Sequence, residues 1–333
     1  MHAWVVDQPG PMATRPLVAT ELPDPAPERG EVLLRVNACG VCRTDLHLAL
    51  GELPPRRART VPGHEVVGTI ERCGPGADRF AVGERVGVAW LRGTCGRCRF
   101  CRTARENLCE SARFTGWDAD GGYAEMAVVP ESYAYRLPDS LDDVAAAPLL
   151  CAGIVGYRAL RRAELPPGGR LGIYGFGASA HVVAQIAVAE GAEVHVGTRS
   201  VQAQELAIRL GAASAGPPET SPPSPLDAAV LFAPAGELVP VALRALDAGG
   251  TLAVAGIYLS DIPALNYEQE LFREKQLRSV TANTRADGEE FLRLAAALRV
   301  RPIVDPRAFT AADAVLTDLD AGRVTGAAVL VMG

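Results

Sequence analysis

A glycine-rich turn between a strand pattern and a helix pattern restricts the fold of this 333-residue chain more than any other feature. Residues 175–180 read G-F-G-A-S-A; LGIYGFG (171–177) has the composition of a buried strand, and AHVVAQIAVAEGA (180–192) that of a helix. Gly175 and Gly177 permit a tight turn and a close approach of the backbone to a pyrophosphate, and the following helix offers free N–H groups. These flanking elements predict a dinucleotide-binding unit.

The alternation of strand and helix patterns continues along the chain. Further strand patterns occupy 193–197, 226–234 and 251–258, and further helix patterns occupy 201–212 and 237–250. A proline- and serine-rich surface loop at 216–225 joins two of these units. Such alternation is typical of an α/β fold with a parallel doubly wound sheet. The expected cofactor contacts in the turn are Gly175, Gly177, Ala178 and Ser179.

The end of the second strand indicates which nicotinamide dinucleotide binds. Sites that prefer NAD place an acidic residue there, roughly 20 residues after the glycine turn, to hold the ribose 2′-hydroxyl. This chain instead reads G-T-R-S at 197–200, so Thr198 and Arg199 are available for a 2′-phosphate. The sequence therefore favours NADP(H) over NAD(H). The alternative is that Arg199 is a solvated residue at a helix start and that both cofactors bind.

The first 150 residues have a different pattern, rich in short strands. Runs of β-branched residues end at glycine or proline, as in EVLLRVNACG, HEVVGTIERCG, GERVGVAW and YAEMAVVP. The last fifty residues return to a mixed pattern. Because 333 residues exceed the size at which one core usually keeps growing, we expect two domains, a β-rich one followed by the dinucleotide-binding one.

Four cysteines lie within fifteen residues and have the spacing C-x2-C-x2-C-x7-C. They are Cys95, Cys98, Cys101 and Cys109. Four thiolates with short spacers suit the closed tetrahedral shell of a structural Zn2+. A disulfide framework is the alternative, but that arrangement is typical of small secreted chains, and no signal peptide pattern precedes this one.

A second, scattered group consists of Cys42, His64 and Cys151. Two thiolates and one imidazole make three protein ligands, which leave a fourth position open, as a catalytic zinc requires. The chain therefore has ligands for two zinc ions, one structural and one catalytic. Cys39 and Cys73 are left over and are expected to be small buried hydrophobic residues.

Five motifs in order resemble a known family. They are C-G-V-C-R-T-D-L-H (39–47), G-H-E (63–65), the four-cysteine lobe, P-L-L-C-A-G (148–153) and the glycine turn. This series resembles the zinc-dependent alcohol dehydrogenases of the medium-chain dehydrogenase/reductase superfamily. The resemblance implies a GroES-like catalytic domain at 1–153, onto which 287–333 folds back, and a Rossmann domain at 154–286. It also implies assembly as a homodimer or homotetramer.

The resemblance implies roles for residues around the catalytic zinc. Glu65 is similar to the carboxylate that lies near the metal and ligates it transiently. Asp45 is similar to the acid that orients the ligand His64, a contact that fixes the tautomer and basicity of the imidazole. Thr44 corresponds to the hydroxyl that hydrogen-bonds the substrate oxygen. His47 corresponds to the residue that passes the proton to solvent through the cofactor ribose.

For three further residues, a role at the cofactor or substrate site is expected, and each has a structural alternative. Arg43 is expected to contact the cofactor pyrophosphate, and the alternative is a solvated arginine. Trp90 and Trp117 are expected to form walls of the substrate pocket, which favours unbranched primary alcohols and aldehydes; the alternative is ordinary core packing. The chain departs from the family pattern at Val155, where many relatives have threonine, and at Gly326, where an arginine often pairs with cofactor phosphate.

We therefore expect a zinc-dependent oxidoreductase that interconverts primary alcohols and aldehydes by hydride transfer with NAD(P). The alternatives are a cinnamyl-type aldehyde reductase that uses NADPH, a zinc-free enone or quinone reductase, and a non-catalytic NADP-binding sensor. The complete Cys42, His64 and Cys151 set disfavours the zinc-free enzyme. The presence of Thr44 and His47 disfavours the sensor.

Net charge and hydropathy limit the kinds of partner. With 33 basic and 39 acidic residues, the net charge of −6 gives no electrostatic reason to expect nucleic acid or an anionic membrane. No apolar run in the sequence reaches the roughly 18–20 residues of a membrane span. We expect a cytoplasmic enzyme with a small-molecule substrate.

Overall fold

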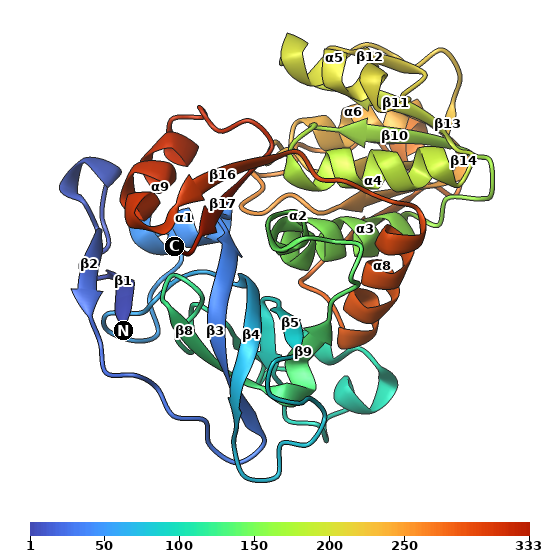
Figure 1. The fold of residues 1–333 in the computed structure, drawn as a ribbon. Helices are drawn as coiled ribbons and strands as arrows, with labels where there is room; N and C mark the ends of the chain where they lie inside the picture. Colours follow the sequence, from blue (N-terminus) through green and yellow to red (C-terminus); the bar gives the residue numbers. More distant parts are fainter. The chain divides into compact units, whose positions relative to one another are not determined.

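The structure, a computed structural model, describes residues 1–333 and contains two compact units (Figure 1). The first, here called the β-rich unit, comprises residues 1–151, 282–296 and 302–333. The second, here called the α/β unit, comprises residues 152–281 and 297–301. The predicted α/β class, with a β-rich part and a doubly wound parallel sheet, is confirmed.

The α/β unit is built on a six-stranded parallel sheet with the order β12-β11-β10-β13-β14-β15. Its strands are β10 (Arg170–Tyr174), β11 (Glu193–Gly197), β12 (Ser214–Gly216), β13 (Leu226–Leu231), β14 (Leu246–Val254) and β15 (Gln276–Ser279). The chain runs outward from β10 to β12 and then returns to β13, so the topological switch point lies between β10 and β13. Ligands of doubly wound sheets bind at the carboxyl ends of the strands beside this point.

Helices connect these strands. They are α3 (Ile154–Ala163), α4 (Ala178–Ala189), α5 (Val201–Arg209), α6 (Leu238–Ala245) and α7 (Tyr267–Glu270). The helix expected over 237–250 is shorter, because α6 ends at Ala245. Leu246 pairs with Leu226 of β13, so the backbone after α6 is taken up by the sheet instead of by a longer helix. Two consecutive glycines, Gly249 and Gly250, also disfavour helix there.

The β-rich unit contains a seven-stranded sheet with the order β16-β17-β3-β4-β5-β9, in which β8 also pairs with β3. Its strands are β3 (Glu31–Gly40), β4 (Glu65–Cys73), β5 (Arg85–Val88), β8 (Met126–Pro130), β9 (Ala134–Arg136), β16 (Val304–Ala308) and β17 (Ala327–Val331). The C-terminal strand β17 runs antiparallel to β3, so the end of the chain completes the sheet built by its first half.

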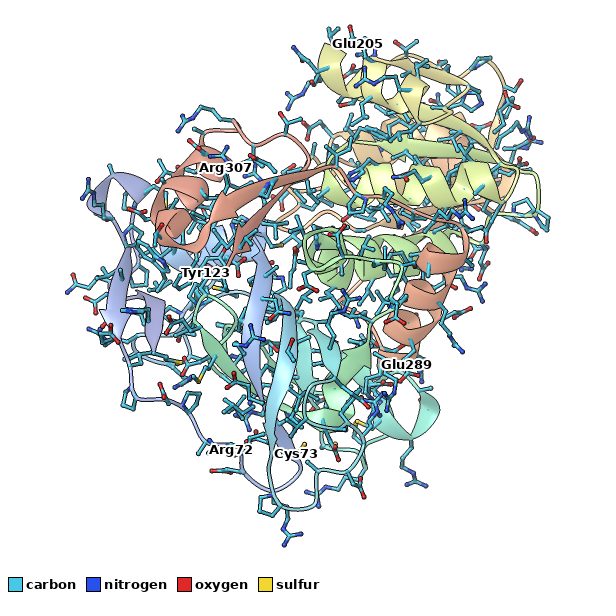
Figure 2. All side chains as sticks on the ribbon, in the orientation of Figure 1. Arg72, Cys73, Tyr123, Glu205, Glu289 and Arg307 are labelled. Carbon is cyan, nitrogen blue, oxygen red and sulfur yellow. The ribbon has the colours of Figure 1, made fainter.

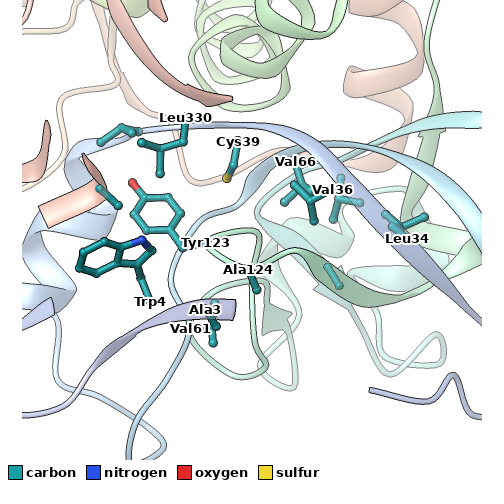
Figure 3. Close-up of a cluster of buried hydrophobic side chains, with 14 of the residues drawn as sticks. Ala3, Trp4, Leu34, Val36, Cys39, Val61, Val66, Tyr123, Ala124 and Leu330 are labelled. Carbon is teal, nitrogen blue, oxygen red and sulfur yellow. The ribbon is translucent and has the colours of Figure 1, made fainter. Parts of the chain in front are cut away.

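Two small sheets and four helices complete the β-rich unit. The sheets pair β1 (His2–Val6) with β2 (Leu17–Glu21), and β6 (Leu91–Gly93) with β7 (Arg113–Phe114). The helices are α1 (Arg43–Leu50), α2 (Asp143–Pro148), α8 (Arg285–Ala297) and α9 (Ala312–Asp320). Figure 3 shows buried side chains of the core, among them Trp4, Leu34, Val66, Tyr123 and Leu330.

The sequence led us to expect no apolar run of that length, but one continuous helical segment, Asp143–Ala163, is long and apolar enough to span a membrane by length and composition. Of its most apolar 18-residue window, 72% is buried inside the protein, as expected for a core helix. The segment is not uniform, because a π-helical turn at Leu149–Gly153 separates α2 from α3. Such turns are rare and are often found at functional sites.

Candidate active site

The scattered ligand group comes together in the β-rich unit. The ligand atoms of Cys42, His64, Glu65 and Cys151 all lie within 4.8 Å of one another. Cys42 is the N-cap of α1, His64 and Glu65 stand at the start of β4, and Cys151 lies in the π-helical turn. Three segments distant in sequence thus converge on one point.

The spacing of these atoms fits a zinc ion. With Zn–S bonds of about 2.3 Å and Zn–N bonds of about 2.1 Å, tetrahedral ligands are separated by about 3.6–3.8 Å. The Sγ atoms of Cys42 and Cys151 are 4.0 Å apart, and His64 Nε2 is 3.4 Å from Cys151 Sγ. The donor set of two sulfurs and one nitrogen is the one that zinc prefers.

Asp45 joins the segments that carry the ligands. Its carboxylate accepts hydrogen bonds from the backbone N–H groups of Cys42 (2.9 Å) and Gly63 (3.0 Å), and from the Tyr123 hydroxyl at 3.4 Å. Asp45 Oδ1 also lies 3.3 Å from His64 Nδ1, at ion-pair distance, although the alignment is not that of a hydrogen bond. The Asp45 side chain is only 2% exposed, so these contacts connect the segments of Cys42 and His64 through a buried carboxylate.

Glu65 fits into space provided by a glycine. Gly40 of β3 pairs directly with Glu65 of β4, and a Cβ atom at position 40 would lie 1.8 Å from Glu65 Oε2. Burial, reinforced by the negative charge of Cys42, raises the pKa of Glu65 well above its usual value. The absence of a side chain at Gly40 thus leaves the space in which the Glu65 carboxyl group lies beside the ligand cluster.

Without metal, the pKa values of the three predicted ligands are shifted in different directions. A hydrogen bond with the Cys151 thiol lowers the pKa of Cys42 well below its usual value, although burial opposes this effect. The same hydrogen bond raises the pKa of Cys151. Burial alone would lower the pKa of His64, but the negative charge of Asp45 raises it well above its usual value. Metal binding therefore releases protons from Cys151 and His64.

Thr44 and His47 lie on one face of α1, because they are three positions apart along the helix. Thr44 Oγ1 is 3.8 Å from Cys42 Sγ, so the hydroxyl stands at the edge of the ligand cluster. His47 Nδ1 lies 2.5 Å from Glu52 Oε2. Arg43, the first residue of α1, is exposed. The structure thus brings Thr44 beside the ligands and gives His47 a carboxylate partner.

Aromatic rings extend from the ligand cluster toward the surface of the β-rich unit. The His64 ring meets Trp90 edge-on at 4.9 Å, and Trp90 stacks on Trp117 with ring centroids 5.9 Å apart. The Arg56 guanidinium lies 3.7 Å from the centroid of the Trp117 ring, and the Trp117 indole donates to the Pro54 carbonyl at 2.9 Å. Trp90 and Trp117 therefore form a stack of rings beside His64, one of the predicted ligands.

The four-cysteine lobe is also assembled. The Sγ atoms of Cys95, Cys98, Cys101 and Cys109 lie within 4.8 Å of one another. Cys95 Sγ and Cys101 Sγ are 3.9 Å apart, close to the separation that a tetrahedral Zn–thiolate shell requires. Backbone N–H groups of Arg97 and Cys98 lower the pKa of Cys95 to about 6. These contacts thus stabilise the thiolate of Cys95, the form that binds metal, whereas the pKa of Cys109 is raised to about 11.

The glycine turn lies in the α/β unit between β10 and α4. Gly175 has φ of +84°, and a Cβ there would lie 2.7 Å from Ala233 N, so the position requires glycine for both conformation and space. Gly177 is the N-cap of α4, whose first residues are Ala178 and Ser179. A Cβ at Gly177 would meet no atom within 4 Å, which leaves room above the helix N-terminus for an anion.

A cavity of about 520 Å³ opens beside this turn. Its lining includes Gly175, Thr198 and Arg199, as the sequence predicts. Two acidic residues that the sequence-based argument did not consider, Glu219 and Glu237, line the same cavity.

Several other residues near the site could not be identified from the sequence. Gly40 and Gly63 stand next to predicted ligands, but their role depends on which side chains they face across the sheet: a Cβ at Gly63 would lie 2.4 Å from Tyr123. Glu52 and Arg56 are in a loop whose charged residues look like ordinary surface residues.

Comparisons with known proteins agree with this site. The model of the alcohol dehydrogenase GroES-like domain matches residues 28–139. Over its whole length the chain is 57% identical to a protein named probable alcohol dehydrogenase AdhA from Mycobacterium tuberculosis, 97% of which is covered. It is 35% identical to an alcohol dehydrogenase from Geobacillus stearothermophilus, with 99% of each chain covered.

Solved structures show the same fold. A cinnamyl alcohol dehydrogenase from Sorghum bicolor has a TM-score of 0.90 and 27% identity, and the alignment covers 99% of this chain and 96% of that one. A thermostable alcohol dehydrogenase from Pyrobaculum aerophilum, described as cobalt and zinc bound, has a TM-score of 0.89 and 26% identity, with 99% of each chain covered.

The fold and the two cysteine-containing sites define a medium-chain oxidoreductase with a GroES-like domain and a dinucleotide-binding domain. The chain belongs to the zinc-type alcohol dehydrogenases of the medium-chain dehydrogenase/reductase superfamily. It is an NAD(P)-linked enzyme that interconverts alcohols and aldehydes.

Proposed function

We propose that this enzyme acts on unbranched primary alcohols and their aldehydes and that it prefers NADP(H). Zinc would be held by Cys42, His64 and Cys151. The observation that carries the proposal is the convergence of these ligands within 4.8 Å, with Thr44 Oγ1 only 3.8 Å from Cys42 Sγ.

The residues of α1 would move the substrate proton. When bound, zinc supplies Lewis-acid polarisation of the substrate oxygen, and the nicotinamide supplies or accepts the hydride. The Thr44 hydroxyl can accept a proton from a substrate hydroxyl while it donates its own. His47, one helical turn further on, can take up a proton and is hydrogen-bonded to Glu52. Asp45 keeps His64 in a fixed orientation, and Glu65 places a second carboxyl group beside the ligands.

A second zinc would be held by Cys95, Cys98, Cys101 and Cys109, so we propose two zinc ions per chain. Four sulfurs leave no position for substrate, and this site is structural. Its lobe has little else to hold it, since its helical elements are 3-10 turns of three residues each.

The preference for NADP(H) is supported by Arg199 at the carboxyl end of β11. Its guanidinium is exposed, lines the cavity beside the glycine turn and makes no hydrogen bond or ion pair, so it is free to pair with a 2′-phosphate. Arg43 is the proposed contact of the pyrophosphate.

The preference for unbranched substrates is supported by the aromatic wall. Trp90 contacts the ring of the ligand His64, and a large planar side chain there restricts the width of the space next to the metal. Branching at the carbinol carbon would bring extra atoms against this wall.

We also propose a cytoplasmic homo-oligomer that forms through the α/β unit. Strand β15 pairs only with β14 and is an edge of the six-stranded sheet. Large apolar side chains are exposed on β15 and in the segment that connects it to β14, namely Ile257, Tyr258, Ile262, Tyr267, Phe272 and Leu277. An unpaired strand beside exposed apolar side chains is a suitable surface for a second copy. Concentration-dependent sedimentation would test this, and a monomer at every concentration would contradict it.

The proposed activity can be tested with a panel of primary, secondary and aromatic alcohols and their carbonyl partners, with NADPH and NADH. We expect the highest kcat/KM for primary aldehydes with NADPH. Thr44→Val should lower kcat/KM by about 10²-fold or more, since it removes a proton-transfer group, while the affinity for NADPH is unchanged. Thr14→Val, which removes an exposed hydroxyl elsewhere in the β-rich unit, is the matched control. Full activity of Thr44→Val would contradict the assigned role.

A further inference from the structure

A hydrogen-bonded turn in the proline-rich loop places Glu219 at the edge of the cavity beside the glycine turn. The Thr220 N–H donates to the Pro217 carbonyl at 3.0 Å, so Pro218 and Glu219 are the central residues of a hydrogen-bonded turn. Proline at the first central position fixes φ before the turn forms. The backbone of Glu219 is therefore held in place, and Glu219 is one of the residues that line the cavity.

This turn packs directly against the end of β11. A Cβ atom added at Gly197 would lie 2.9 Å from Pro218 Cα, so the turn approaches the strand as closely as a glycine allows. The Thr198 N–H also donates to the Gly216 carbonyl at 2.8 Å, which joins the end of β11 to the last residue before the turn. Position 219 is thus tied to the strand end that carries Arg199.

Two charged residues of this cavity, Arg199 and Glu219, have no hydrogen-bond or ion-pair partner. Arg199 and Glu219 are exposed, line the same cavity and make no hydrogen bond or ion pair, with each other or with any other residue. Glu237, the third charged residue of the cavity, differs because its carboxylate accepts a hydrogen bond from the Ser260 hydroxyl at 3.3 Å. A free cation and a free anion therefore face one space of about 520 Å³.

We propose that Glu219 is a second residue that determines cofactor specificity and that it opposes Arg199. This proposal rests on the proposed NAD(P)-linked function. A carboxylate in the adenosine part of the site accepts hydrogen bonds from ribose hydroxyls and repels a 2′-phosphate, whereas Arg199 attracts that phosphate. The acid that is absent from the end of β11 is thus supplied by the loop after β12. The enzyme therefore accepts NAD(H) as well as NADP(H), with a preference smaller than Arg199 alone would produce.

The expected effect of Glu219 is moderate. A 2′-phosphate carries a charge of about −1.5 to −2 near neutral pH, and exposed charges interact through a high dielectric constant with salt screening. We therefore expect removal of one carboxylate charge to change the ratio of the dissociation constants for NADH and NADPH by about three- to tenfold.

The test is direct measurement of binding, without turnover. Dissociation constants for NADPH and NADH, and for adenosine 2′-monophosphate and adenosine 5′-monophosphate as fragments, would be measured by calorimetry. Glu219→Gln should tighten the binding of NADPH and adenosine 2′-monophosphate relative to NADH and adenosine 5′-monophosphate. Arg199→Gln should shift the ratio in the opposite direction. Glu205→Gln removes an exposed charge from α5, outside this cavity, and should leave the ratio unchanged (Figure 2).

An unchanged ratio in Glu219→Gln, or a shift toward NADH, would overturn the inference while the NAD(P)-linked function stands. If wild-type protein bound neither dinucleotide, both the inference and the proposed function would fail. Melting temperatures equal to that of the wild type would establish that the variants are folded, as expected for substitutions of exposed side chains.

Discussion

Replacement of Asp45 by asparagine should weaken metal binding more than any other change that leaves the ligands intact. In the wild type, one carboxylate accepts hydrogen bonds from the N–H groups of Cys42 and Gly63 and lies 3.3 Å from His64 Nδ1. Asparagine keeps the shape of this side chain but replaces one acceptor oxygen by an NH2 group. At least one backbone N–H then faces another donor, and His64 loses its negatively charged neighbour.

The magnitude follows from these contacts. A hydrogen bond to a charged group contributes about 1.5–3 kcal/mol, and a buried donor left without an acceptor costs about 1–3 kcal/mol. Asp45→Asn should therefore lower the free energy of unfolding by about 2–4 kcal/mol. Groups that orient a metal-bound histidine typically contribute 10- to 100-fold in metal affinity, and we expect a loss of about that size.

Zinc affinity would be measured by chelator competition, and stability by urea denaturation. Tyr123→Phe is the matched control, because it removes only the 3.4 Å hydrogen bond to the same carboxylate and should change zinc affinity by less than about threefold. If Asp45→Asn bound zinc within twofold of the wild type, the argument that this carboxylate positions the ligand set would be refuted.

Two further changes test the packing and the electrostatics of the fold. Gly40→Ala should displace Glu65 and lower the free energy of unfolding by about 2–4 kcal/mol, because the added Cβ would lie 1.8 Å from Glu65 Oε2. Gly216→Ala is the control, because a Cβ there meets no atom within 4 Å. Equal urea midpoints for the two variants would contradict this prediction. Asp227→Asn should destabilise the protein by about 1 kcal/mol at pH 7, because the hydrogen bond from Arg170 holds the pKa of Asp227 below its usual range. Because the pKa of Asp227 is lower in the folded state, the ionised carboxylate stabilises the fold at pH values above about 4, the pKa of the unfolded state. This contribution is lost as the pH falls through the pKa of the folded state, so the difference in stability between Asp227→Asn and the wild type should shrink below about pH 4. A constant difference from pH 7 to pH 3 would contradict this prediction.

The sequence predicted the four-cysteine cluster and the glycine turn because their patterns are local. Cys95, Cys98, Cys101 and Cys109 are close in sequence, and a strand followed by G-x-G-x-x-A needs no distant partner to be interpreted. The alternation of strands and helices predicted the parallel sheet for a similar reason, since periodicity is a property of each segment. Segment boundaries were predicted less well: the helix expected over 237–250 ends at Ala245, and the strand expected over 226–234 ends at Leu231.

What the sequence could not predict depends on contacts between distant residues. Gly40 is required because Glu65 occupies the opposite position in the neighbouring strand. Glu219 reaches the cavity beside β11 because its turn packs on Gly197. The π-helical turn around Cys151 likewise follows no sequence periodicity, and Pro148 inside the segment would sooner predict the end of a helix.

The central claim is that one chain holds two zinc ions and that the one bound by Cys42, His64 and Cys151 is required for activity. Zinc content measured by elemental analysis tests it directly. The account predicts two zinc ions per wild-type chain, and one per chain for Cys42→Ser, which should stay folded and lose activity. Cys73→Ser, at the end of β4 and outside both clusters, should keep two zinc ions and full activity (Figure 2). A Cys42→Ser protein with two zinc ions and full activity would contradict the account.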